Sequence, residues 1–448
     1  MNSKKKFDLI IKRKINSFNK TIKVDSDKSI SIRSLIIGSI SEKVSIIKNI
    51  LESEDVLSTV KCLKQLGVKI IRKKMFYQVY GKGLGSLRAK KNQQINFGNS
   101  GTLARLIIGV LSTTPNISLD LTGDHSLKKR NMKKLILLMS KFGAIFKPVK
   151  KFYLPFKIFS SNIPIGINYK AGVSAQLKSA VILAGLNSNG STRIIEQDQS
   201  RDHTEKMLSQ NKNIIKIFKK KKKIIKINGK KTLKPLKINI SGDPSSAAFF
   251  CALTILNKKS SLKITNVGLN PTRIGFYNIL KAHGAKLKFT NIKKKNNEIY
   301  GDIIVKNCKI KPITASKKYY VNSTDEYPIL FVIAALTKGI STFKGIKDLA
   351  NKESNRIVEM KNILNQIGVK TKSSNNSIKI FGKGLIRANN KKINTANLGD
   401  HRICMSAFIL AILTGAKAEI KNFETVYTSS PSFLNIMKFL GAKYEIRK

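Results

Sequence analysis

Along the chain, a stretch with amphipathic helical spacing is followed repeatedly by a glycine, a small residue and a short strand-like run. A glycine suits this position because it lets the chain leave a helix through positive φ and enter a strand. Successive copies lie ~75 residues apart. Five copies carry the glycine, at 63–69, 139–144, 280–286, 364–370 and 437–443, and a degraded sixth copy, at 207–213, has Lys212 in its place.

Six units of this kind account for the whole chain, and each also carries strand-like runs, for example 69–72 and 444–446. An α+β unit of this size cannot bury its apolar surface alone, so the units must pack on one another. Because 448 residues exceed one typical core, we expect two domains of three units each.

The composition adds a strongly basic charge to this picture. A formal charge of +60 first suggests a nucleic-acid binder, but only 13 of the 85 basic residues are arginine. The excess of Lys, Asn and Ile resembles the output of an A/T-rich genome, so we interpret most of the charge as incidental. The longest lysine run, 219–223, lies between strand-like runs at 214–218 and 224–227 and has no interleaved aromatic residues. It predicts a solvated hairpin rather than a nucleic-acid site.

If lysine is the default cation, the positions that remain arginine are informative, because only arginine offers a planar, bidentate fork to carboxylate or phosphate. Seven of the arginines fall in the helix-start motifs described below: Arg33, Arg105, Arg130, Arg201, Arg273, Arg356 and Arg402.

The cysteines and the apolar runs indicate the cellular compartment in which we expect the protein. Cys62, Cys251, Cys308 and Cys404 lack CxxC spacing and predict reduced thiols in a cytoplasmic protein. The four histidines are dispersed, so we expect no metal site. Residues 1–20 lack the apolar segment of a secretion signal, and no apolar run reaches 18 residues, so no membrane association is expected.

Residues 27–33, DKSISIR, combine a predicted helix start near Ser31 with several hydrogen-bond donors. A helix start presents unpaired N–H groups and partial positive charge, which favours an anion. Ser29 and Arg33 are four residues apart and share a helical face, and Lys28 can project from the loop before it. Taken alone, the pattern also fits a capped helix with two solvated cations.

Comparable helix starts recur along the chain, at 97–105, 121–130, 174–179, 200–205, 241–246 and 270–273. Three further starts in the second half, at 323–328, 351–356 and 399–402, bring carboxylates suited to proton transfer. In the second of these, Lys352 and Arg356 are predicted to project from one helical face, with Glu353 beside them. Jointly, these starts suit substrates that carry phosphate and carboxylate groups.

In combination, these motifs resemble those of the 5-enolpyruvylshikimate-3-phosphate (EPSP) synthase family. Their residues are closer to the class II bacterial branch of the family than to the class I branch. The motifs are DKS-I-S-x-R at 27–33, GN-x-GT at 98–102, GD-x-SL-x-x-R at 123–130, S-A-Q-x-KSA at 174–180, RDHTEKML at 201–208, GDPSS at 242–246, NPTR at 270–273, DEYP at 325–328, KES-x-R at 352–356 and DHR at 400–402.

The resemblance implies a two-lobed, inside-out α/β barrel, each lobe built from three βαβαββ repeats around buried helices. Residues 1–24 with 244–448 would form a discontinuous first lobe and 25–243 the second, with the active site in the cleft between them. The implied reaction transfers the enolpyruvyl group of phosphoenolpyruvate to the 5-hydroxyl of shikimate 3-phosphate. It proceeds without a cofactor or a metal, through a tetrahedral intermediate, in a monomer.

The resemblance also assigns roles to residues. The implied ligands of shikimate 3-phosphate are Lys28, Ser29, Arg33, Ser174, Gln176, Arg201, Asp325 and Lys352. The implied ligands of phosphoenolpyruvate are Lys28, Gly101, Arg130, Gln176, Arg356 and Arg402. Asp325 is the expected base for the hydroxyl, and Glu353, assisted by Lys28 or Lys352, is the expected donor of the carbon proton.

Some positions depart from the family pattern. Asp25-Ser26 stands where Pro-Gly is usual and adds negative charge beside the anion site, Asn355 replaces an Asp, and Ser430 replaces a Phe. Gly101 predicts sensitivity to glyphosate, because the resemblance implies that some resistant class II members carry Ala there.

Three alternatives remain open. The sister transferase that acts on UDP-N-acetylglucosamine carries a Cys near the loop equivalent to 123–130, and this chain has none there. An RNA-handling protein would explain the charge, and an inactive paralogue would explain the departures. Steep salt dependence of RNA binding and the rate of phosphate release separate these alternatives from the enzyme.

Overall fold

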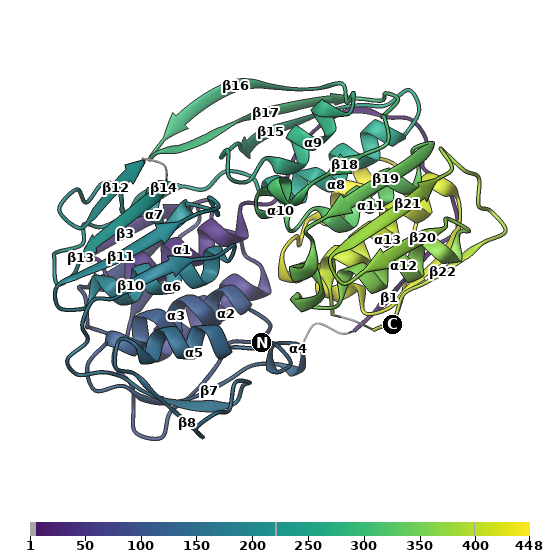
Figure 1. The fold of residues 1–448 in the computed structure, drawn as a ribbon. Helices are drawn as coiled ribbons and strands as arrows, with labels where there is room; N and C mark the ends of the chain where they lie inside the picture. The colour runs from purple at the N-terminus through teal and green to yellow at the C-terminus, as the bar shows by residue number, and fades with distance from the viewer. Residues whose placement is uncertain (1–5, 220–221, 398) are drawn as a thin grey trace. The chain divides into compact units, whose positions relative to one another are not determined.

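The computed structural model describes residues 6–219, 222–397 and 399–448. The chain clusters into two compact units, which we call unit 1 (Met1–Asp25, Gly242–Lys293 and Ile299–Lys448) and unit 2 (Ser26–Ser241 and Lys294–Glu298). Each unit is mixed α/β, with sheets on the outside and helices inside (Figure 1).

The described residues form six four-stranded sheets, three for each unit. The sheets of unit 2 are β14 (Lys237–Asn239), β3 (Glu42–Lys48), β5 (Phe76–Lys82), β4 (Lys69–Arg72); β6 (Gln94–Asn96), β7 (Ser118–Thr122), β9 (Phe156–Phe159), β8 (Ile145–Lys147); and β10 (Asn168–Ala171), β11 (Ser191–Glu196), β13 (Lys223–Asn228), β12 (Ile215–Lys219). Those of unit 1 are β16 (Leu287–Lys295), β17 (Glu298–Lys306), β15 (Ser261–Gly268), β2 (Asn19–Lys23); β18 (Thr314–Ala315), β19 (Gly339–Lys344), β21 (Ser377–Gly382), β20 (Thr371–Ser374); and β22 (Lys392–Asn394), β23 (Lys417–Ile420), β1 (Asp8–Ile11), β24 (Glu445–Arg447).

The sheets share one pairing pattern. In five of them a parallel edge pair is followed by two antiparallel pairings, as in β14–β3, β3–β5 and β5–β4. In the sixth, β2 pairs parallel with β15, which pairs antiparallel with β17. This common pattern confirms the sixfold repeat predicted from the sequence.

Each repeat also supplies a second helix: α2 (Glu54–Gln65), α5 (Lys133–Ser140), α7 (His203–Leu208), α9 (Gly275–Ala282), α12 (Arg356–Gln366) and α14 (Phe433–Phe439). In five repeats the predicted glycine follows the helix at positive φ, from +78° at Gly368 to +95° at Gly441. A side chain at these positions would be strained, which explains why glycine ends the helix there.

Six further helices form the interior: α1 (Lys28–Ser39), α3 (Gly101–Thr113), α6 (Ala175–Leu186), α8 (Pro244–Leu256), α11 (Tyr327–Ala335) and α13 (His401–Thr414). Every residue of α8, α11 and α13 is buried, as expected of helices without a polar face. Helices α3 and α6 approach closely at Gly109, because glycine has no side chain. A Cβ at this position would lie only 2.6 Å from the Ala180 carbonyl oxygen.

Short helices complete the description: α4 (His125–Lys128), α10 (Lys317–Ser323) and the 3-10 segments η1 (Lys347–Asn351) and η2 (Phe423–Thr428). Within the described residues, no helix has both the length and the apolar character needed to cross a membrane.

Candidate active site

Six of the ten predicted motifs lie at the N-termini of the six interior helices, and the other four lie at or just before α4, α7, α9 and α12. In five of the interior helices a motif side chain accepts a hydrogen bond from a backbone N–H of the first turn: Asp27 for α1, Ser100 for α3, Ser174 for α6, Asp243 for α8 and Asp400 for α13. The sixth, α11, follows Asp325 and Glu326 and has Pro328 in its first turn. These ends carry the partial positive charge that suits anionic substrates.

Within unit 2, the starts of α3 and α6 lie together. Gln176 Nε2 donates to Thr102 Oγ1 at 3.0 Å, and a full helix length later Thr113 Oγ1 donates to the Ala184 carbonyl at 3.2 Å. Because the early residues pair with each other and the late residues do the same, the two helices are parallel. Their N-termini therefore open at one end of the unit (Figure 1).

Lys28, the first residue of α1, and Arg130, beside the start of α3, have defined partners. Lys28 Nζ is 2.9 Å from Asp55 Oδ2, and both side chains are largely buried. Arg130 donates from Nη2 to Asn99 Oδ1 and, at 3.3 Å, to Ser126 Oγ. A Cβ on Gly101 would lie 2.8 Å from Arg130 Nη1, so Arg130 rests directly on the start of α3.

The predicted residue Arg33 is buried and bound within the protein. Its Nε donates to Thr204 Oγ1 at 3.0 Å, its Nη1 to the Ser29 carbonyl at 3.1 Å and its Nη2 to Ser179 Oγ at 3.3 Å. Arg33 thus joins α1, α6 and α7, while Arg201 lies just before α7 and is partly exposed. The contacts gather Ser29, Arg33 and the start of α7 in one region of unit 2.

In unit 1, Arg356 brings the predicted carboxylates together. Its Nε donates to Asp400 Oδ2 at 2.9 Å and its Nη2 to Glu353 Oε2 at 2.7 Å, and its Nη1 is 3.8 Å from Asp325 Oδ1. The guanidinium is 1% exposed. Burial lowers the pKa of Arg356, but the charges of Asp400 and Glu353 outweigh it, so the net shift is upward and the group stays cationic.

Some buried guanidinium nitrogens of unit 1 have no hydrogen-bond acceptor among the described residues. Among them are Nε and Nη1 of Arg402 and Nη1 of Arg356, although the latter lies 3.8 Å from Asp325 Oδ1. The Arg402 guanidinium also lies over the Phe249 ring, 5.7 Å from its centroid. Buried N–H groups are nearly always hydrogen-bonded, so these orphaned donors indicate an anionic ligand.

Three local predictions were wrong. Helix α1 begins at Lys28 rather than near Ser31, because the Asp27 side chain caps it by accepting from Ile30 N at 2.8 Å. Lys352 and Arg356 do not share a helical face, because α12 begins at Arg356 and Lys352 is the C-cap residue after η1. Lys352 pairs instead with Asp348, at 2.9 Å.

The third error concerns the lysine run at 219–223, of which 220 and 221 lie outside the described residues. Strands β12 and β13 form the predicted hairpin. Lys223, however, is not solvated: its side chain is 10% exposed and pairs with Glu196 and Glu205.

The sequence reasoning missed the partners of the predicted residues. Asp55 pairs with Lys28, and Asp400 accepts two donors of Arg356. Asp55 gave no signal, since an acid in the first turn of a helix is ordinary. Asp400 is part of the DHR motif, and its position as the N-cap of α13 was the one signal that it is a buried acceptor.

The departures Asp25 and Ser430 compensate each other. Asp25 Oδ2 accepts from Ser430 Oγ at 2.9 Å, from Ser432 Oγ at 2.7 Å and from Ser432 N at 3.1 Å. The added carboxylate is therefore bound within unit 1. Burial raises the pKa of Asp25, although these hydrogen bonds act in the opposite direction.

This raised pKa predicts how an Asn substitution changes stability with pH. The stability that protonated Asp25 contributes is complete below the unfolded pKa of ~3.9 and is lost as pH rises through the higher folded pKa. An amide side chain cannot ionise, so we expect the melting temperature of Asp25→Asn, relative to the parent, to rise between pH 4 and pH 7. Thermal denaturation at both pH values measures this difference. Asp198→Asn, at an exposed position, is the control, and a difference for Asp25→Asn that is constant or falls contradicts the expectation.

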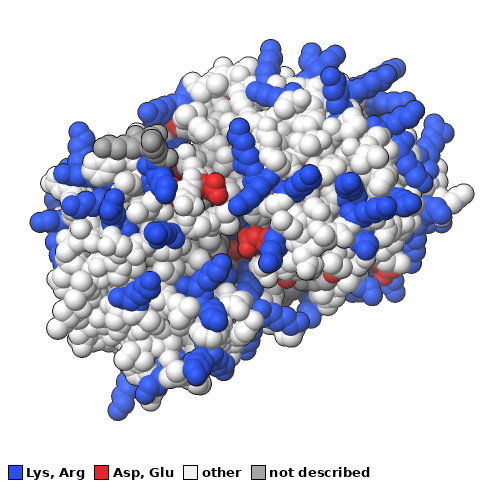
Figure 2. All heavy atoms as spheres, viewed as in Figure 1, with Lys and Arg blue, Asp and Glu red and all other residues white. Residues whose placement is uncertain are grey.

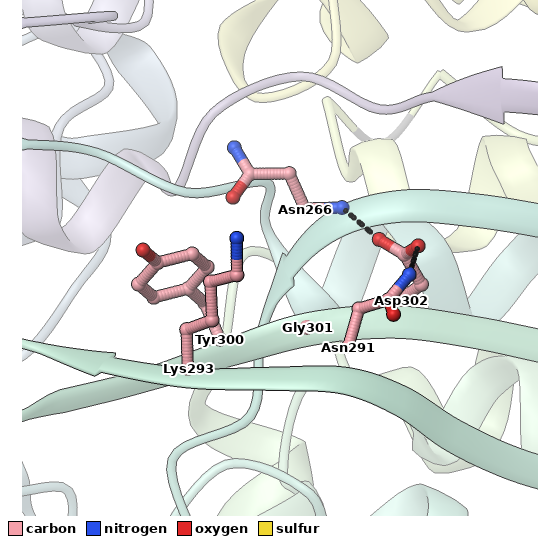
Figure 3. A pocket seen from close by; sticks show the side chains of 6 residues that line it. All are labelled: Asn266, Asn291, Lys293, Tyr300, Gly301 and Asp302. Atoms are coloured by element: carbon pink, nitrogen blue, oxygen red, sulfur yellow. Dashed lines mark hydrogen bonds between the residues drawn. The ribbon is translucent and has the colours of Figure 1, made fainter.

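A shallow pocket on the β16-β17-β15 surface is lined by other residues: Asn266, Asn291, Lys293, Tyr300, Gly301 and Asp302 (Figure 3). Asp302 accepts from Asn266 N at 3.0 Å and from Asn291 Nδ2 at 2.8 Å. The predicted site residues do not line this pocket, so we do not assign it to the active site.

The basic charge is spread over the face of the molecule that Figure 2 draws. Figure 2 shows Lys and Arg side chains dispersed over the visible face and separated by uncharged atoms. This distribution supports the interpretation of the charge as incidental.

The comparisons with known proteins agree with this picture. The structure resembles EPSP synthase from Acinetobacter baumannii, with a TM-score of 0.84, 32% identity and coverage of 99% of this chain and 100% of that one. It also resembles the enolpyruvyl transferase NikO from Streptomyces tendae, with a TM-score of 0.77, 99% coverage of each chain and 12% identity, a likeness of fold alone. The fold is thus that of an enolpyruvyl transferase.

Sequence comparison narrows the class. The family model for EPSP synthase (3-phosphoshikimate 1-carboxyvinyltransferase) matches residues 12–437. Proteins named 3-phosphoshikimate 1-carboxyvinyltransferase from Zymomonas mobilis and Petrotoga mobilis are 36% and 38% identical, covering 98% and 94% of this chain and 97% of each relative. The chain belongs to the EPSP synthase family. It is a transferase of the shikimate pathway, which leads through chorismate to the aromatic amino acids, and the resemblance seen in the sequence is confirmed.

Proposed function

We propose that the helix N-termini of both units hold shikimate 3-phosphate and phosphoenolpyruvate together while the enolpyruvyl group moves to the 5-hydroxyl. The observation that carries the proposal is the set of buried guanidinium donors on Arg356 and Arg402 that have no hydrogen-bond acceptor among the described residues. A phosphorylated carboxylate supplies the acceptors that these donors lack. The residues of unit 2 offer complementary donors at the starts of α1, α3 and α6.

The substrates divide between these groups. Shikimate 3-phosphate would be held by Lys28, Ser29, Arg33, Ser174, Gln176, Arg201, Asp325 and Lys352. Phosphoenolpyruvate would be held by Lys28, Gly101, Arg130, Gln176, Arg356 and Arg402. Arg33 and Lys352 already have protein partners, so their contribution requires that they share donors with the ligand.

Asp325 and Glu353 would carry the protons. The hydroxyl oxygen attacks C2 of phosphoenolpyruvate, its proton passes to Asp325, and the methylene carbon takes a proton from Glu353. Return of a methyl proton to the Glu353 carboxylate then restores the double bond as phosphate leaves. Arg356 lies beside both carboxylates and favours their ionised forms, which suits a base at Asp325. For the same reason, Lys28 or Lys352 would supply the first proton that Glu353 passes to the carbon.

We place the enzyme in the cytoplasm as a monomer. Its four cysteines form no disulfide, as expected in a reducing compartment. Phosphate release tests the activity: it should require both substrates. Phosphate release from phosphoenolpyruvate alone, or RNA binding that survives high salt, contradicts the proposal.

The Gly101 position predicts the response to glyphosate. An alanine methyl there would lie 2.8 Å from the terminal nitrogens of both Arg105 and Arg130, so it displaces guanidinium groups beside the proposed phosphoenolpyruvate site. We expect the parent enzyme to be glyphosate-sensitive. Gly101→Ala should raise the KM for phosphoenolpyruvate and raise the inhibitor concentration for half-inhibition by at least ~10-fold.

Inhibition curves at fixed phosphoenolpyruvate measure both quantities. Gly172→Ala is the matched control, because an added methyl there meets nothing within 4 Å, and it should behave as the parent. Unchanged turnover of the parent at glyphosate concentrations well above the KM for phosphoenolpyruvate would refute the expectation.

A further inference from the structure

Unit 2 contains a buried cluster of four charges that the reaction does not use. Lys178 Nζ lies 2.7 Å from Glu196 Oε1 and 2.7 Å from Glu205 Oε1. Lys223 Nζ lies 3.1 Å from Glu196 Oε2 and 3.1 Å from Glu205 Oε1. The Lys178 and Glu196 side chains are 0% exposed, Glu205 is 1% exposed and Lys223 is 10% exposed.

Stability alone does not explain this cluster. Removing four charges from water is costly, and apolar side chains of similar volume often replace a buried ion pair without loss of stability. Lys178 also stands in α6, where the residues that follow it, 179–186, are all buried and mostly apolar. The other contacts of the cluster therefore indicate what it does.

Those contacts converge on Ser200. Lys178 Nζ donates to the Ser200 carbonyl at 3.4 Å. Glu196 Oε1 accepts from Ser200 N at 2.8 Å and from Ser200 Oγ at 2.6 Å. Ser200 is 0% exposed and lies in residues 197–202, which have no regular structure between β11 and α7. The cluster thus fixes the backbone of this connection on both sides of Ser200.

The same connection is fixed again four residues later. Thr204 Oγ1, in α7, is 2.8 Å from Ser179 Oγ and accepts from Arg33 Nε at 3.0 Å. Lys178 and Ser179 are neighbours on α6, so one turn of this helix holds both ends of the segment 200–204. Arg201 lies between the two points and is partly exposed, next to the buried residue that the cluster holds.

We propose that Lys178 and Glu196 are positioning residues that set the Arg201 guanidinium for the phosphate of shikimate 3-phosphate. The inference rests on the proposed role of Arg201 in binding that substrate. A donor fixed in its bound geometry loses less entropy on binding and holds the ligand in register. Lys178 and Glu196 act through Ser200 and do not touch the substrate. Lys223 balances the second carboxylate charge and stabilises the cluster.

Ser200→Ala tests the proposal with the least risk to folding, because it removes one hydroxyl and leaves all four charges. We expect the KM for shikimate 3-phosphate to rise ~10-fold, with kcat and the KM for phosphoenolpyruvate within ~2-fold of the parent. Lys178→Met should shift the same KM further, and Lys178→Arg should restore part of it. Steady-state kinetics with each substrate varied in turn measures these values.

Lys223→Met is the matched control, because it removes the other cation from the same two carboxylates. It should lower the melting temperature but leave the KM for shikimate 3-phosphate within ~2-fold. The proposal is overturned if Ser200→Ala leaves this KM unchanged, or if Lys223→Met raises it as much as Ser200→Ala does. Arg201→Ala separates the proposed binding role of Arg201 from the proposed positioning role of the cluster. If Arg201→Ala has no effect on this KM, the binding role of Arg201 is wrong. If Arg201→Ala raises the KM while Ser200→Ala does not, the positioning role is wrong.

Discussion

Asp325→Asn is expected to lower kcat for phosphate release by ~10²- to 10⁴-fold, the usual contribution of a positioned base. The amide keeps the shape of the carboxylate but cannot accept the proton of the 5-hydroxyl. It also keeps an oxygen near Arg356, which lies 3.8 Å from Asp325 in the parent, so the fold should survive. Steady-state phosphate release with both substrates saturating measures the loss.

The control for this substitution is Asp348→Asn, on η1 of the same unit, where the carboxylate is 47% exposed and pairs with Lys352. It should reduce kcat far less. If Asp325→Asn retains the turnover of the parent, Asp325 is not the base and another group must accept the hydroxyl proton.

Arg356→Met is expected to cause the largest loss of stability. Arg356 gives two hydrogen bonds to Asp400, whose side chain is 0% exposed, so the variant leaves a buried carboxylate without its cation. Removing one partner of a buried pair lowers the free energy of unfolding by ~3–5 kcal/mol. Denaturant titration measures the change, and Arg447→Met is the control: its 69%-exposed side chain pairs with Glu419 at 3.9 Å, so the loss should be under ~1 kcal/mol.

Arg356→Lys separates the catalytic role from the structural one. Lysine keeps the positive charge near Asp400, Glu353 and Asp325 but cannot form the bidentate fork. We expect a folded protein whose kcat/KM for phosphoenolpyruvate falls by ~10²-fold or more. A variant with parental kcat/KM would show that the fork contributes to folding alone.

The sequence predicted the repeats well because their signals are local. A glycine after an amphipathic helix must serve a positive φ, and five such glycines, among them Gly67 and Gly441, have it. The helix starts of the site motifs were also predictable, since caps such as Ser174 and prolines such as Pro244 act within one turn. Errors at this level were confined to boundaries, as at Lys28, where the Asp27 cap moved the start of α1.

The sequence could not predict partners that meet only through the tertiary fold. Asp25 and Ser430 are 405 positions apart and read separately as two unfavourable departures, yet they bind each other. Lys223 looked solvated because it stands in a lysine run. Only the pairing of β13 with β11, where Lys223 is opposite Glu196, and the contact with Glu205 of α7 give it two carboxylate partners. The cluster around Lys178 was missed for the same reason.

The central claim is that residues of both units bind the same substrate, and the dissociation constant of shikimate 3-phosphate tests it most directly. Titration calorimetry should be run on the parent, on Arg201→Ala in unit 2 and on Asp325→Ala in unit 1. We predict that both variants weaken binding, each by ~10-fold or more. Binding as tight as that of the parent in Asp325→Ala would show that Asp325 of unit 1 does not hold this ligand and would contradict the account.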